Sequence, residues 1–482
     1  MPIRALKNFS TACNWPLASL NNSKIAIDGF WFIRKYFSAL EINEMMCSFE
    51  DYVTRQLKGI LGKCKDIQFL WVWDGLKYKP EMKDASSELE REISFLCENR
   101  KLKFGKSIDV LELFVTPVNN VLTKYGIEFC RAPYGAIAQI AYFYNNKCVD
   151  YIFTKSDVFL FNNVDRAIIE FDFKNNSLCF FDRNEIEKTL KIKKHVFKLY
   201  MLASGCEFSP TIPEFSNEFD NELFREFFIT KVFKNDSVPS NFGAIKAFYT
   251  QNIVFCRQIE NGLYFHKLHP IMSLNGKIEP VENFNTHVDM VSLFGIKLPV
   301  SFYEALFECK VQPIGISEYV FNQSYHSKSE EINKIKDLTA DLLNYRLKNK
   351  SDSNFILDII KDELGLKTDH DKEQERTLEI AFLHFVKNTK NVCTPLINCI
   401  VGKRALNENL HNLEANFELK KDDFIMFFRL REYVNWYKIF SLFYSEFEKT
   451  ISNYSLFDFS TKFCAPVKNT GLYKSFVAKF NL

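Results

Sequence analysis

The sequence predicts an α/β fold for its first part, a parallel β-sheet covered by helices on both faces. Between residues 24 and 205, short apolar runs alternate with longer mixed segments that can form helices. This alternation is typical of parallel sheets, because the crossover between two parallel strands is usually a helix. Three aspartates, Asp28, Asp74 and Asp157, fall at or just beyond the ends of apolar runs. Ligand sites of such sheets lie at these carboxyl ends.

The strands of this sheet are predicted from runs rich in β-branched and aromatic residues. The runs are Ile25–Ile27, Ile67–Trp73, Tyr151–Thr154 and Ala167–Phe171. After Leu199 the composition changes, because five acidic residues and two prolines precede the next basic residue, Arg225. Proline interrupts helices, so we expect this sheet domain to end near residue 215.

A small mixed α/β domain is predicted at residues 216–325. Leu263–Leu274 and Lys277–Val281 are expected to pair as a β-hairpin, because the Asn-Gly pair between them fits a tight type I′ turn. A helix is predicted at Ser301–Lys310. His266 and His269 have no carboxylate or cysteine at a matching metal-ligand spacing, so we interpret both as structural.

The last part of the chain, residues 326–482, is predicted to be a mainly helical domain. Apolar residues recur there at helical spacing, for example at Leu378, Ala381, Phe382 and Phe385. A chain of 482 residues with 47% hydrophobic content can support two or three such domains with real cores.

Composition also limits the function classes. With 62 basic and 60 acidic side chains the net charge is only +2, so nucleic-acid contact would need a local basic patch. The candidates are Lys77, Lys79, Lys83 and Arg91, which follow the second predicted strand. No apolar run approaches the ~20 residues of a membrane span, so no membrane partner is expected. Thirteen scattered cysteines favour reduced thiols and a cytoplasmic or nuclear location.

Five segments share an order with a known enzyme superfamily. They are Lys24–Gly29, Leu70–Gly75, Arg131–Gln139, Thr154–Phe161 and Leu202–Glu207. Together they resemble the XPG and flap-endonuclease superfamily, which has a PIN-like fold and holds divalent metals with seven carboxylates. Each Asp-Gly pair, taken alone, is explained by an ordinary strand-to-loop turn. Their common order with the other segments favours shared ancestry.

The resemblance implies that the metal site has decayed. Three metal-binding aspartates remain, Asp28, Asp74 and Asp157, and four other positions are substituted by Gly135, Ile137, Lys155 and Cys206. A one-residue shift of the last segment would bring Glu207 to the place of Cys206. Three aspartates less one lysine leave two formal negative charges, too few to hold a pair of Mg²⁺ ions. We therefore expect no catalytic residue, no metal and no other cofactor.

Two further segments, Phe265–Val281 and Leu293–Tyr303, resemble the region that follows the nuclease-like domain in fungal MKT post-transcriptional regulators. That resemblance implies a pseudo-nuclease that acts as an adaptor in regulating mRNA stability or translation. The expected partner is an ataxin-2-like protein associated with poly(A)-binding protein, and the expected location is cytoplasmic messenger ribonucleoprotein. RNA is a possible second partner.

Two other functions stay open from the sequence. One is a direct RNA-binding module that uses the old nuclease groove and its basic residues, which would bind more weakly as salt rises. The other is a structure-specific nuclease that uses a single metal at Asp28, Asp74 and Asp157. We rank the adaptor first, the RNA-binding module second and the nuclease third.

Overall fold

The computed structural model describes residues 3–6, 13–41, 49–78, 91–95, 98–99, 101–102, 108–233, 241–282, 293–295, 298 and 300–313. The predicted helical domain at residues 326–482 lies outside the described residues. The domain boundaries at residues 215 and 325 therefore stay predictions.

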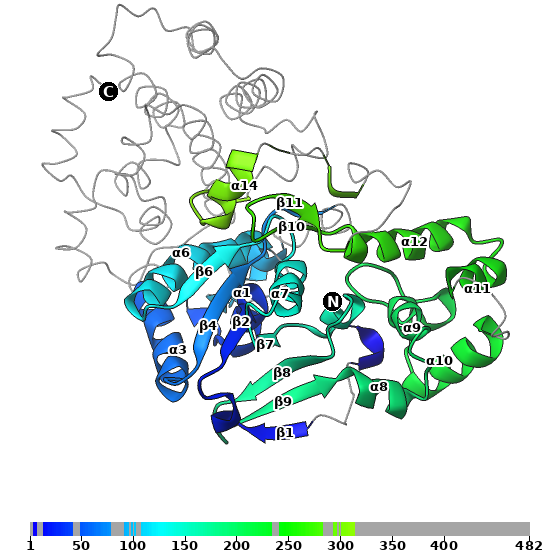
Figure 1. Cartoon of the computed structure of the whole chain (residues 1–482), viewed down its shortest axis with the longest axis horizontal. Coiled ribbons are helices and arrows are strands. Elements are labelled where there is room, and N and C mark those ends of the chain that lie inside the picture. The colour runs from blue at the N-terminus through cyan, green and yellow to red at the C-terminus, as the bar shows by residue number, and fades with distance from the viewer. Residues whose placement is uncertain are drawn as a thin grey trace, which may run out of the picture.

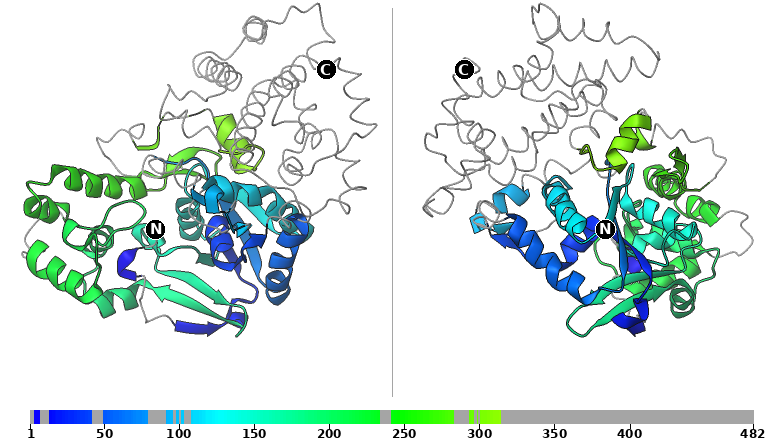
Figure 2. Two further views of the ribbon diagram at one scale, coloured as in Figure 1. Left: turned by 180° about the vertical axis from the view of Figure 1, so that it is seen from behind. Right: turned by 60° about the vertical axis from the view of Figure 1, so that its left-hand side comes forward.

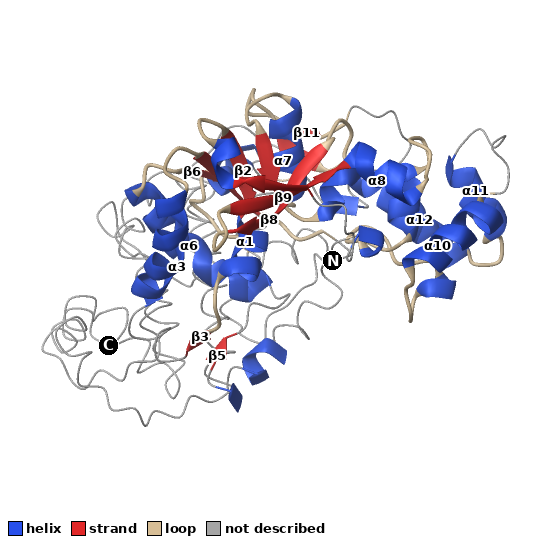
Figure 3. Cartoon of the chain, turned by 90° about the horizontal axis from the view of Figure 1, so that it is seen from below, coloured by secondary structure: helices blue, strands red, loops and turns tan. Residues whose placement is uncertain are grey.

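A seven-stranded sheet forms the centre of the described part, in the order β1-β9-β8-β7-β2-β4-β6 (Figures 1 and 3). Its strands are β1 (Cys13–Pro16), β2 (Lys24–Asp28), β4 (Gln68–Trp73), β6 (Glu128–Arg131), β7 (Tyr151–Phe153), β8 (Arg166–Asp172) and β9 (Ser177–Asp182). The five strands from β8 to β6 are parallel, whereas β9 runs antiparallel to both β8 and β1. The mostly parallel α/β sheet expected from the sequence is therefore confirmed.

The four predicted strands correspond to β2, β4, β7 and β8. Three strands were not predicted, namely β1, β6 and β9. In strand β6 polar and apolar residues do not alternate regularly, and charged residues stand at both ends, Glu128 and Arg131. Its backbone nevertheless pairs with β4 along Leu70 to Trp73. Pairing with an existing neighbour thus decides strand formation where local composition gives little signal.

Helices cover both faces of the sheet. Helices α1 (Gly29–Tyr36), α3 (Phe49–Lys63) and α6 (Ile108–Lys124) belong to the crossovers from β2 to β4 and from β4 to β6. Helix α7 (Ala136–Asn145) belongs to the return crossover from β6 to β7, which lies on the other side of β2. Crossovers between parallel strands are right-handed. Because the chain moves across the sheet in the opposite direction from β6 to β7, α7 lies on the opposite face (Figure 2). The carboxyl ends of β2, β4 and β7 meet at this reversal.

The chain after the sheet forms a mainly helical lobe at the side of β8 and β9 (Figures 1 and 2). It contains α8 (Arg183–Leu190), α9 (Phe197–Ala203), α10 (Asn221–Phe227), η5 (Phe228–Val232), α11 (Asn241–Phe248) and α12 (Ile253–Lys267). Among all described helices, none has both the length and the apolar character needed to cross a bilayer.

The predicted β-hairpin exists, but it is shorter than expected. Residues up to Lys267 belong to α12, and only β10 (Pro270–Met272) and β11 (Ile278–Pro280) pair as strands. The predicted type I′ turn is wrong. Such a turn needs a positive φ at both residues of the Asn-Gly pair, but only Gly276 has one, of 71°. The Gly276 N–H instead donates to the Ser273 carbonyl. The predicted helix at residues 301–310 is α14 (Val300–Phe307). Two further short strands, β3 (Leu40–Glu41) and β5 (Lys101–Leu102), pair with each other.

Candidate functional site

Asp28 ends β2 and lies at the meeting point of the strand ends. Its Oδ1 accepts a 3.0 Å hydrogen bond from the Trp31 N–H, so it caps α1, and its Oδ2 accepts one of 2.8 Å from the Thr154 hydroxyl. Only 3% of the residue is exposed. Burial raises the pKa of Asp28 above its ordinary value, and the Lys155 ammonium opposes that rise.

Asp74 follows β4 and is held in the same way. Its Oδ1 accepts a 2.6 Å hydrogen bond from the N–H of Ala136, the first residue of α7. Burial, together with the nearby Asp28, raises the pKa of Asp74 to about 6. The backbone carbonyl of Asp74 accepts a 2.9 Å hydrogen bond from Arg131, which also forms a buried ion pair with Glu112.

Asp157 lies in the short helix η3 (Ser156–Leu160) that follows β7. Its Oδ1 accepts a 3.0 Å hydrogen bond from the Glu207 N–H, whereas its buried Oδ2 has no hydrogen-bond partner among the described residues. Burial raises the pKa of Asp157 to about 6, against the effect of Lys155. All three aspartates are thus fixed through one oxygen by a backbone N–H.

Lys155 stands among these carboxylates and forms an ion pair with Glu207. Its side chain is only 14% exposed, and that of Glu207 only 10%. Burial alone would lower the pKa of Lys155, but Glu207 and the three aspartates raise it above its ordinary value. The lysine is therefore charged, and among the described residues the four carboxylates and the Lys155 ammonium together carry three formal negative charges.

Glu207, and not Cys206, supplies the carboxylate of the last segment. Besides pairing with Lys155, Glu207 accepts a 2.7 Å hydrogen bond from the Tyr78 hydroxyl. Burial alone would raise the pKa of Glu207, but Lys155 holds it well below its ordinary value. Cys206 is buried against Ser209, and burial raises its pKa to about 12, so the thiol is protonated. The alternative alignment of this segment, shifted by one residue, therefore agrees with the structure, because Glu207 and not Cys206 points into the site.

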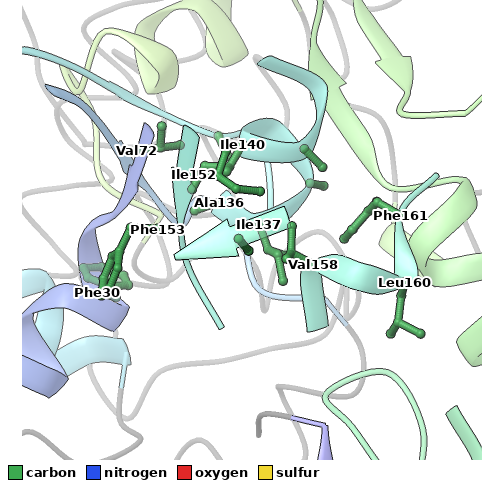
Figure 4. Packing of buried hydrophobic residues seen from close by; sticks show 14 of the residues in the cluster. Phe30, Val72, Ala136, Ile137, Ile140, Ile152, Phe153, Val158, Leu160 and Phe161 are labelled. Atoms are coloured by element: carbon green, nitrogen blue, oxygen red, sulfur yellow. The ribbon is translucent and has the colours of Figure 1, made fainter. Parts of the chain in front are cut away.

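Gly135 and Ile137, the two positions predicted to be substituted in the central motif, lie at the start of α7. The Gly135 N–H donates a 2.9 Å hydrogen bond to His269 Nε2, and a Cβ at this position would lie only 3.2 Å from that nitrogen. Ile137 is 1% exposed and belongs to the hydrophobic core near Val158 (Figure 4). Gly135 is thus packed against an imidazole, and Ile137 belongs to the core.

His269 enters the site from the segment between α12 and β10. It is fully buried, and aromatic rings surround it: Tyr78, Tyr134, Phe161, Phe208 and Phe294. Burial lowers the pKa of His269 to about 4, so the imidazole is neutral at physiological pH and can accept the Gly135 N–H. Its interpretation as a structural histidine agrees with these contacts.

The hairpin beyond His269 is anchored to α7 by Gln139. The Gln139 side chain donates a 2.9 Å hydrogen bond to the Met272 carbonyl and accepts one of 2.8 Å from the Met272 N–H. Tyr142, one helical turn later, accepts a 3.1 Å hydrogen bond from the Leu274 N–H, and Tyr134 donates one of 2.7 Å to the Phe294 carbonyl. The hairpin therefore packs directly beside the strand ends.

The predicted nucleic-acid contacts do not form one described patch. Lys77 is 7% exposed, so its side chain is not open to solvent. Arg91 lies in a helical stretch at residues 91–95 and is exposed. Lys79 and Lys83 lie outside the described residues. Contact with nucleic acid at these four positions stays a prediction.

Sequence reasoning missed two contributors to the site, His269 and Gln139. Gln139 is the last residue of the central motif, but its partner in β10 lies 133 residues later. No local pattern connects His269 with Gly135, because the contact depends on how the hairpin packs. In the part of the chain that the structure describes, no three His, Cys, Asp or Glu side chains are grouped so that they could hold a metal ion.

Comparisons with known proteins agree with the motifs. No protein-family model matches the chain. A segment of 88 residues, 18% of the chain, is 31% identical to post-transcriptional regulator MKT1 of Saccharomyces cerevisiae, and it spans only 11% of that protein.

Three solved structures show a distant likeness to this chain. The catalytic core of Rad2 in complex with a DNA substrate is 20% identical with a TM-score of 0.36, covering 52% of this chain and 72% of that one. Flap endonuclease-1 from Methanococcus jannaschii is 17% identical with a TM-score of 0.34, covering 54% and 98%. Human GEN1 in complex with Holliday junction DNA is 15% identical with a TM-score of 0.37, covering 70% and 78%. Likenesses this distant say nothing about activity.

The predicted resemblance to MKT-type post-transcriptional regulators is thus confirmed over the matched segment, in a chain with the expected α/β fold.

Proposed function

We propose that this protein is a catalytically inactive, nuclease-like adaptor in post-transcriptional regulation that acts through an ataxin-2-like partner. The observation that carries the first half of this proposal is the Lys155–Glu207 ion pair in the middle of the retained aspartates. The partner is inferred from the resemblance to MKT-type regulators.

The residues present do not fit a two-metal centre. Two divalent ions require many oxygen ligands and a strongly negative site, because four positive charges must be offset. Here an ammonium is already paired with one of the four carboxylates, and each aspartate gives one oxygen to a backbone N–H. Without its metals, a phosphodiesterase site of this family has no evident source of rate acceleration.

The hairpin argues against use of the old groove by nucleic acid. His269 fills the space beside Gly135, and Gln139 ties β10 to α7, so the start of α7 is covered by protein. With Lys77 buried as well, a direct RNA-binding function in this groove has less support than an adaptor.

An adaptor works through its surface, and one part of this surface is unusually apolar. Of the eight large hydrophobic residues that stand exposed in the described chain, five come from α10, η5, α11 and the start of α12. They are Leu223, Ile229, Phe248, Ile253 and Val254, and we call them the lobe patch. The exposed Glu222 precedes Leu223, and the exposed Glu226 follows it one turn later. Exposed apolar residues that gather on neighbouring helices often mark a protein interface.

The proposal is tested by capture of partners from cell extract with the full chain. Wild-type protein is expected to retain an ataxin-2-like protein, and Leu223→Asp combined with Phe248→Asp is expected to lose it. Tyr125→Asp is the matched control, since Tyr125 is 47% exposed, between Phe248 at 41% and Leu223 at 61%, but directly follows α6, away from the lobe patch. Recovery of replication or repair factors in place of the expected partner would contradict the adaptor function.

A nuclease assay tests the inactive site separately. Purified chain, incubated with flap and single-stranded DNA or RNA in Mg²⁺ or Mn²⁺, is expected to leave the substrates intact. Cleavage that disappears in Asp28→Ala would establish a one-metal nuclease. Salt-dependent RNA binding without cleavage would favour the RNA-binding module instead.

A further inference from the structure

The turn between α8 and α9 carries a concentrated positive charge. Residues 183–198 include six basic and two acidic side chains, which leaves +4, whereas the whole chain carries only +2. Two of the basic residues are paired, Arg183 with Glu187 and Lys198 with Glu282. The other four are exposed lysines, which we call the basic turn: Lys188, Lys191, Lys193 and Lys194.

The basic turn belongs to a part of the fold that is separate from the aspartate site. Helix α8 follows β9, whose last residue, Asp182, pairs with Arg166 at the amino end of β8 (Figure 1). The three aspartates lie at the opposite, carboxyl ends of the parallel strands. Lys191 ends α8 with a left-handed φ of 51°, and the Ile192 N–H donates back to the Glu187 carbonyl. The four lysines therefore lie around one tight turn.

Local helix stability explains only part of this charge. Lys188 lies in the last turn of α8, where a cation is stabilised by the helix dipole. Lys193 and Lys194 instead come just before α9, and a cation near the start of a helix is disfavoured. The first turn of α9 has no acidic residue to compensate. Among the described residues, Lys188, Lys191 and Lys194 have no ion-pair partner either.

The surroundings of the basic turn favour phosphate over other anionic partners. Between residues 183 and 203 no large hydrophobic side chain is exposed, and Ile192, Val196 and Phe197 are buried. A protein interface has an apolar core, and a helix that binds a membrane surface inserts an apolar face. Exposed aromatic rings, on which bases would stack, are also missing from this segment. Contact with phosphates requires only cations, and lysine supplies a point charge on a flexible stem.

We propose that the basic turn binds the phosphate backbone of RNA without reading its sequence. The choice of RNA over DNA rests on the proposed post-transcriptional function, whereas the site itself shares no residue with the lobe patch. Partner capture and RNA binding can therefore fail independently. The site also differs from the old nuclease groove, since none of the groove lysines belongs to it.

The test measures binding of the full chain to labelled single-stranded RNAs of unrelated sequence, by fluorescence anisotropy over a range of salt concentrations. Each phosphate contact on a single strand adds about −0.7 to the slope of log K against log salt concentration, so four lysines should give a slope of about −3. RNAs of different sequence should bind with equal affinity.

The decisive variant combines Lys188→Gln, Lys191→Gln and Lys194→Gln. With one lysine left, the slope should fall to about −1, and the affinity at low salt should fall by at least about tenfold. The same three positions changed to arginine should keep the slope, because the charge is kept. All three side chains are exposed, so the melting temperature should not change.

The matched control combines Lys58→Gln, Lys65→Gln and Lys124→Gln. These lysines are also exposed and lie in or just after α3 and α6, so the control loses the same net charge elsewhere. It should keep the wild-type affinity and slope. Equal weakening of the control would show a general charge effect and would overturn the proposal.

Three other results would also overturn it. One is wild-type protein that does not bind RNA, or binds it without salt dependence. The second is RNA binding that persists unchanged in the glutamine variant, which would place the contact elsewhere, for example in the groove. The third is tighter binding to polyglutamate or to phosphatidylserine vesicles than to RNA, which would assign the basic turn to an acidic protein or to a membrane surface.

Discussion

Substituting Gln139 by alanine should release the hairpin that covers the candidate site. The Gln139 amide makes two hydrogen bonds to the Met272 backbone, of 2.9 and 2.8 Å, and it is fully buried, as Met272 nearly is. In Gln139→Ala both backbone groups of Met272 would lose their partners in a place that water reaches poorly. Among the described residues, no other side chain both donates a hydrogen bond to the β10 backbone and accepts one from it.

The expected cost follows from the two orphaned groups. Leaving a buried donor or acceptor unsatisfied costs about 1–3 kcal/mol, so the pair amounts to about 2–6 kcal/mol of unfolding free energy. Tyr142→Phe is the matched control on the same helix, since it removes a single hydrogen bond to the exposed Leu274 and should cost less than about 1.5 kcal/mol.

Urea unfolding of the full chain, followed by tryptophan fluorescence, measures the loss of stability, because Trp71 and Trp73 are buried in the sheet. Hydrogen exchange locates it: amides of residues 269–282 should exchange faster in Gln139→Ala and remain protected in Tyr142→Phe. A loss below about 1 kcal/mol with unchanged exchange in the hairpin would refute the reasoning, because the two bonds would then not hold the hairpin.

Three further predictions concern the buried residues Glu112, His269 and Gly75. Glu112→Ala leaves its buried arginine partner unpaired and should cost about 3–5 kcal/mol in urea unfolding, whereas Glu128→Ala, in an exposed ion pair, should cost less than about 1 kcal/mol; equal costs would contradict the assigned burial. Burial lowers the pKa of His269 to about 4 from 6.5, so its contribution to stability is complete above pH 6.5 and is lost as the pH falls toward 4. Between these pH values wild type should therefore lose up to about 3 kcal/mol more than His269→Phe, and parallel pH profiles of the two proteins would disprove this. Gly75→Ala places a methyl group against the backbone oxygens of residues 132 and 133 and should lower the melting temperature sharply, whereas Gly59→Ala, exposed in α3 with open space around it, should raise stability by about 0.5–1 kcal/mol; a tolerated Gly75→Ala would show that the two loops can separate.

The sequence by itself determined the central strands and the residues at their ends. Runs such as Ile25–Ile27 and Ile67–Trp73 are strands because continuous apolar segments suit a sheet that is buried on both faces. The order of the motifs placed Asp28, Asp74 and Asp157 at the carboxyl ends of these strands, where the structure finds them. Both the strands and the residues at their ends can be predicted from short segments of sequence, because the apolar character of a strand and the position of a residue after it are local properties.

Only the tertiary structure decided which side chains fill the site. The single-residue difference between Cys206 and Glu207 depends on the turn after α9, which points Glu207 toward Lys155 and Cys206 toward Ser209. His269 reaches Gly135 across 134 residues of sequence, because the hairpin docks on α7. Contacts of this separation arise from packing between elements, and no periodicity or motif within one segment records them. The charge balance of the cluster is therefore a property of the folded chain, although each of its residues can be read from the sequence.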